Sequence, residues 1–75
     1  MKSPSPGMRR ALRQARLYGH LLVRNDRLYH PGGNHPICSI QLAREMVRSG
    51  WMTKHDGEYE ITAEGQLAAE SELGR

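Results

Sequence analysis

The segment from Ser39 to Leu67, SIQLAREMVRSGWMTKHDGEYEITAEGQL, constrains the fold more than any other part of the chain. Apolar residues recur at helical spacing over 40–49, and Gly50 is placed to end this helix. Two β-rich runs then flank a tight turn at Asp56-Gly57, which is typical of a hairpin. A last helix begins near Thr62. The segment therefore predicts a helix, a hairpin and a second helix.

A further helix and a further hairpin are predicted before this segment. Residues 8–18 carry apolar side chains on one helical face and arginines on the other, and Gly19 is placed as the C-cap. The runs His20–Arg24 and Arg27–His30 flank Asn25-Asp26, a dipeptide that tolerates the left-handed backbone of a two-residue hairpin turn. The pattern predicts helix, hairpin, helix, hairpin, helix.

The chain length allows one domain. A domain of 75 residues buries only about 60% of its unfolded surface. Because the chain has no Phe, its core is small, which leaves room for a homodimer or a protein partner to complete it. Residues 1–7, MKSPSPG, are predicted to be a disordered tail, and residues 8–75 to form the single domain.

Features of membrane and secreted proteins are missing from the pattern. The longest apolar run, Leu21-Leu22-Val23, is far shorter than the roughly 20 residues that span a bilayer. The basic start MKSPSPGMRR has no apolar stretch behind it, so no signal peptide is expected. The single cysteine, Cys38, has no partner for an internal disulfide. We expect a cytoplasmic protein that makes no membrane contact.

Charge is distributed unevenly along the chain. Residues 1–48 hold nine basic and two acidic residues, a net charge of +7, whereas residues 49–75 hold two basic and six acidic residues, a net charge of −4. Such asymmetry creates a field with a positive side, which suits a polyanion such as duplex DNA. The alternative is that the charges only solvate a small domain.

Two groups of residues are candidates for DNA contact. Gln41, Arg44 and Arg48 follow i, i+3, i+7 spacing, so they point the same way from one helix, and these residue types pair with adenine edges, guanine edges or phosphates. The first helix carries a second basic group, suited to phosphate contacts: Arg9, Arg10, Arg13 and Arg16. The alternative for both groups is an ordinary solvated helix face. Asp56 and Glu58 near the turn of the second hairpin would repel phosphates.

Catalysis and metal binding are not expected. His30, His35 and Cys38 give the spacing H-x4-H-x2-C, but no fourth ligand stands at standard zinc-site spacing. Gly32-Gly33 belong to a predicted loop, PGGNHP, and not to a glycine-rich phosphate loop. Cys38 has no arguable base, and so short a chain offers no obvious concave pocket. We therefore expect neither a cofactor nor an enzyme activity.

Three motifs resemble the second half of a winged helix-turn-helix domain. Gly50-Trp51-Met52 closes the predicted recognition helix, Asp56-Gly57 marks the wing tip, and YEITAEG at 59–65 leaves the wing. The resemblance implies an α+β, winged-helix-like domain. One departure is the hairpin at 20–30, where winged helices have a helix; in this respect the pattern resembles the small YjhX-like toxin or regulator family.

Two functional hypotheses follow from the residues and the resemblance. The first is a small DNA-binding transcriptional regulator, of the accessory or prophage type, that reads DNA with the helix 40–49 and grips phosphates with the arginines of the first helix. The second is a winged-helix protein-interaction module, such as an inhibitor or toxin-like factor acting on a host enzyme or regulator. The basic first half favours the regulator, and the acidic wing favours the interaction module.

Overall fold

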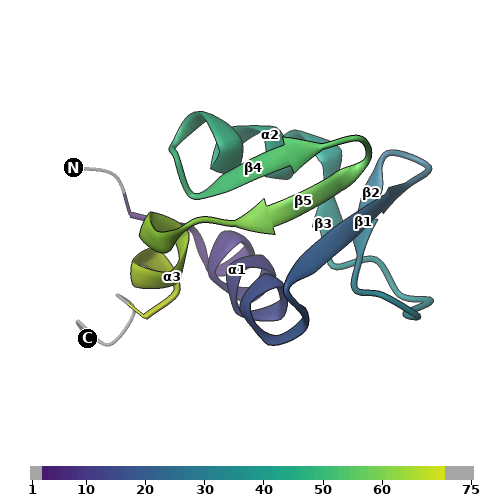
Figure 1. Ribbon diagram of the computed structural model, residues 1–75, viewed down its shortest axis with the longest axis horizontal. Helices are drawn as coiled ribbons and strands as arrows, with labels where there is room; N and C mark the ends of the chain where they lie inside the picture. The colour runs from purple at the N-terminus through teal and green to yellow at the C-terminus, as the bar shows by residue number, and fades with distance from the viewer. Residues whose placement is uncertain (1–2, 71–75) are drawn as a thin grey trace.

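The computed structural model describes residues 3–70 and contains three helices and five strands within that range (Figure 1). In chain order the elements are α1 (Pro6–Tyr18), β1 (His20–Arg24), β2 (Arg27–Tyr29), β3 (Cys38–Ser39), α2 (Ile40–Arg48), β4 (Met52–His55), β5 (Glu58–Ile61) and α3 (Ala63–Glu70). The predicted α+β order of helix, hairpin, helix, hairpin, helix is confirmed. The two-residue strand β3 is an addition, and it stands directly before α2.

All five strands form one antiparallel sheet in the order β3-β2-β1-β5-β4. Strand β1 lies at its centre and joins the two hairpins, with Leu21 opposite Tyr59. The backbone N–H of Val23 also donates to the carbonyl of Gly57 over 3.0 Å, which ties the wing turn to β1. The β4–β5 hairpin is therefore a continuous part of the sheet.

Both hairpins close through two-residue turns, as predicted. Asn25 and Asp26 have φ values of 50° and 63°, and Asp56 and Gly57 have φ values of 49° and 88°. Positive φ at both central residues gives the turn a twist that matches the twist of the flanking strands.

The core lies between the inner face of the sheet and the helices. The buried apolar residues are Met8, Ala11, Leu12, Ala15, Leu21, Leu28, Ala43, Met46, Trp51, Met52, Tyr59, Ala68 and Ala69. Trp51 is only 8% exposed, so its predicted place in the core is confirmed. Two residues predicted to pack with it, Val47 and Ile61, are half-buried against the same core.

The first helix begins earlier than predicted. It starts at Pro6, where we expected Met8, because Ser5 is the N-cap and its hydroxyl accepts a hydrogen bond from the Met8 N–H over 3.2 Å. Pro4 is buried. Part of the segment predicted to be a disordered tail therefore belongs to the folded domain.

The last helix buries a different face from the one predicted. Leu67 was expected to pack inward, but its side chain is 66% exposed. The buried face consists of Gly65, Ala68 and Ala69, whose i, i+3, i+4 spacing places Leu67 on the opposite side. Leu73, also predicted to pack inward, lies outside the described residues.

The close approach of α3 to Trp51, just before β4, explains which face is buried. A Cβ atom at position 65 would overlap the carbonyl oxygen of Trp51, so glycine is required there. Thr62 fixes the same junction: its hydroxyl donates to the Gly50 carbonyl over 2.7 Å and accepts from the Gly65 N–H over 2.9 Å. The motifs on either side of the wing therefore meet in space and hold the fold together.

No helix within residues 3–70 has both the length and the apolar character needed to cross a bilayer.

Candidate nucleic-acid interface

Helix α2 carries the first group of candidate DNA contacts, and both its ends are anchored. At its start, Ser39 is the N-cap and accepts from the Leu42 N–H over 3.2 Å, while the Ile40 N–H donates to the Asp26 carbonyl over 2.9 Å. The second bond joins the helix to the β1–β2 turn. At its end, the Trp51 N–H donates to the Met46 carbonyl over 2.9 Å. The helix therefore has a fixed orientation on the domain.

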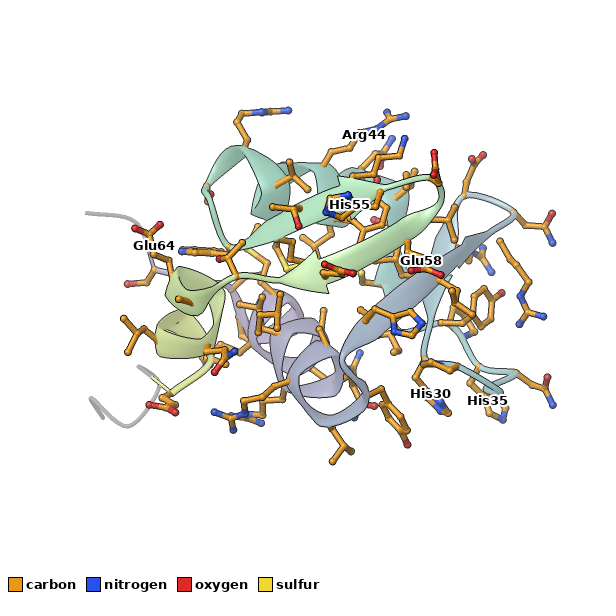
Figure 2. All side chains as sticks on the ribbon, viewed as in Figure 1. His30, His35, Arg44, His55, Glu58 and Glu64 are labelled. Carbon is orange, nitrogen blue, oxygen red and sulfur yellow. The ribbon has the colours of Figure 1, made fainter. Side chains whose placement is uncertain are left out.

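The exposed face of α2 presents the three predicted residues together. Gln41, Arg44 and Arg48 are all exposed, and Ala43 and Met46 on the other side of the helix are buried. At 3.6 residues per turn the three exposed positions fall within an arc of about 60°. Figure 2 shows Arg44 projecting from the upper side of the domain. Packing of the apolar face thus leaves these polar groups directed at solvent.

Two further charged residues modify this face. Lys54 stands opposite Tyr59 on the neighbouring strand, so it belongs to the sheet face that α2 packs against. It is exposed and adds positive charge beside the helix, a contribution that the sequence analysis missed because it depends on strand register. Glu45 is also exposed and falls about 40° from Gln41 around the helix. Its negative charge opposes that of Arg44 and Arg48.

The arginines of α1 do not form one uniform clamp. The Arg16 guanidinium pairs with the Glu70 carboxylate over 3.1 Å, and the Arg9 guanidinium donates to the Pro4 carbonyl over 3.1 Å. Arg9 and Arg13 each make additional interactions. Arg10 differs from them, because it faces the segment around β3 and lines a cavity there.

The two basic groups also lie on different sides of the domain. Helix α1 runs along the lower part of the view in Figure 1, whereas Arg44 of α2 projects from the upper side in Figure 2. A duplex docked on the exposed face of α2 would therefore not face all of the α1 arginines at once.

The wing brings acidic groups rather than a basic tip. Asp56 is exposed at the turn, and Glu60 is exposed on β5. The His55 ring lies beside Glu60, with 3.8 Å between its Nε2 and a carboxylate oxygen, and the two form an ion pair only when the ring is protonated. Phosphates approaching the wing would meet negative charge, as the sequence indicated.

No feature of Cys38 indicates that its thiol acts as a nucleophile. Burial raises the pKa of its thiol to about 11, although the nearby charge of Arg10 acts in the opposite direction. The thiol is therefore protonated at neutral pH, and the thiolate is the reactive form. Within residues 3–70, no three His, Cys, Asp or Glu side chains are placed to share a metal ion.

Comparisons with known protein families, curated proteins and solved structures gave no match. The resemblance to a winged helix-turn-helix domain therefore stays a prediction from the sequence, and the structure shows a small α+β domain.

Proposed function

We propose that this protein is a small DNA-binding regulator that places the exposed face of α2 in the major groove. The observation that carries the proposal is the shared exposure of Gln41, Arg44 and Arg48 opposite a buried apolar face, on a helix anchored at both ends. The nine residues of α2 rise about 13 Å. A helix, about 10–12 Å in diameter with its side chains, fits a major groove about 12 Å wide.

The position of each residue along α2 determines whether it is proposed to contact bases or phosphates. Residues near the N-terminus of a recognition helix contact base edges, which assigns base contacts to Gln41 and Arg44. Arg48 in the last turn and Lys54 on β4 lie further along and suit phosphates. The α1 arginines take a lesser, phosphate-positioning role, because Arg16 is already paired with Glu70. The acidic wing stays off the DNA.

Fluorescence anisotropy with labelled duplex DNA at low salt tests the proposal. Arg44→Ala should weaken binding by about 1–3 kcal/mol and relax base preference. Arg13→Ala should weaken binding to all sequences alike and reduce the salt slope by about one. In wild type, the log–log slope against salt should be about −0.9 per phosphate contacted.

Two variants sharpen the test. Glu45→Gln removes a negative charge from the same face, so it should tighten binding. Arg27→Ala removes an exposed arginine from β2 and serves as the control of matched charge, because strand alternation puts its side chain on the face of the sheet opposite the buried Leu28. If wild type does not bind duplex DNA at low salt, or Arg44→Ala behaves like Arg27→Ala, the DNA-reading proposal is wrong.

A protein-interaction module is the second candidate function. The observation that favours it is the outer face of the sheet, where alternate residues such as Leu22, Glu58 and Glu60 point away from the core, and which no helix within residues 3–70 covers (Figure 1). A partner retained by wild type and by Arg44→Ala, but lost by Glu60→Lys, would support this function.

A further inference from the structure

A cavity of about 250 Å³ lies between α1 and the loop that follows β2. Its walls come from two segments: one side of α1 and the loop between β2 and β3. The lining residues are Arg10, Gln14, His30, His35, Pro36 and Ile37.

The polar groups of this cavity are suited to an anion. The guanidinium of Arg10, the amide of Gln14 and the ring of His35 offer N–H donors, and the His30 Nε2 becomes a donor when that ring is protonated. No carboxylate is among the lining residues. Arg10 forms no ion pair with a carboxylate of the described residues. The Cys38 thiol, which lies near Arg10, is uncharged at neutral pH. An entering anion therefore meets donors and no opposing charge.

His30 is held rigidly in the cavity wall. Its ring stacks on Tyr18 with 4.4 Å between ring centroids and 8° between ring planes. Its Nδ1 donates to the Pro31 carbonyl over 3.0 Å, which leaves Nε2 for other contacts. A Cβ atom at Gly33 would lie only 2.6 Å from Nε2, so glycine allows the loop to pack against the ring.

The loop itself is fixed to the sheet. The Gly33 N–H donates to the His30 carbonyl over 2.9 Å, and the Arg24 guanidinium donates to the Gly33 carbonyl over 3.0 Å. At the far end of the loop, the Ile37 N–H donates to the Leu28 carbonyl over 2.7 Å. These bonds hold the backbone of the loop in place before any ligand arrives, which lowers the entropic cost of binding.

We infer that this cavity binds the phosphate group of a small ligand. Arginine and protonated histidine donate short, charge-assisted hydrogen bonds to phosphate oxygens. The cavity is smaller than the sites of about 300–1,000 Å³ that enclose drug-sized ligands, so it holds a phosphate-bearing end rather than a whole large cofactor.

The cavity is separate from the proposed DNA surface. His30 and His35 lie at the lower right in Figure 2, and Arg44 lies at the top. A duplex seated on α2 would leave the cavity open, and the ligand-binding measurement needs no DNA. Failure of one proposal is therefore distinguishable from failure of the other.

Histidine ring resonances followed by NMR provide the test, with inorganic phosphate as the probe. The titration is run at about pH 6, where an ordinary histidine carries a proton, and at constant ionic strength set with chloride. We expect saturable shifts of the His30 and His35 resonances. His55 on the wing, which lines no part of the cavity, is the internal reference and should not shift in parallel.

Two variants and one control complete the test. Arg10→Gln should weaken phosphate binding about tenfold, the loss expected for one charge-assisted hydrogen bond, and His35→Gln should weaken it as well. Both residues are exposed, so both variants should fold. Arg27→Gln removes the same charge from β2, outside the cavity, and should bind phosphate like wild type.

Three results would overturn the inference. The first is phosphate binding unchanged in Arg10→Gln. The second is a parallel response of His55, or an equal response to chloride, because either would indicate a general ionic effect. The third is a shift of His30 and His35 by duplex DNA but not by inorganic phosphate, which would assign the cavity to the DNA backbone.

Discussion

Replacing Gly65 with alanine should destabilise the domain by about 2–4 kcal/mol, although alanine is the better helix former. Helix propensity alone would favour the variant by about 1 kcal/mol. Against this, the added methyl group overlaps the Trp51 carbonyl oxygen, and overpacking of this kind costs about 1–3 kcal/mol.

The clash also affects the hydrogen bonds at the junction. Moving α3 away from the Gly50-Trp51 segment would stretch the bonds from the Thr62 hydroxyl to the Gly50 carbonyl and from the Thr62 N–H to the Trp51 carbonyl. Each is worth about 1 kcal/mol. Together these losses exceed the gain in helix propensity.

Thermal unfolding followed by circular dichroism measures the effect. For a domain of this size, each kcal/mol lowers Tm by about 4–8 °C, so Gly65→Ala should lower it by at least about 8 °C. The matched control is Gln66→Ala on the exposed side of α3, which should stay within about 0.5 kcal/mol of wild type. A Gly65→Ala protein as stable as wild type, or more stable, would refute the close approach of α3 to Trp51.

Two further predictions concern buried residues. Trp51→Ala should cost roughly 3–5 kcal/mol, a large part of the stability of so small a domain; a shift in Tm of only a degree or two would contradict its burial. Cys38 should react slowly with iodoacetamide at neutral pH, and the rate should rise as pH approaches its thiol pKa of about 11, because only the thiolate reacts. Rapid alkylation of the folded protein at pH 7, compared with the urea-unfolded protein, would show that the thiol is not shielded.

Local sequence determined the order of the elements. Residues such as Asn25-Asp26, Ser39 and Gly50 act through their own backbone or through bonds to residues a few positions away, so their effects are readable from spacing. The exposure of Gln41, Arg44 and Arg48 follows from the same rule, because burying one side of a helix exposes the other. The loop at 31–36 is also apparent from its prolines and glycines.

Tertiary structure decided which residues of distant segments contact one another. The close packing of Gly65 on Trp51 selects the buried face of α3, which overrides the larger hydrophobicity of Leu67. The pairing of Arg16 with Glu70 joins residues 54 positions apart and reduces what the α1 arginines can offer to DNA. The cavity that contains Arg10 and His35 likewise exists only because the loop before β3 folds back on α1. Helical periodicity predicts the direction in which a side chain leaves its own helix. The residue that this side chain contacts depends on how the separate elements pack.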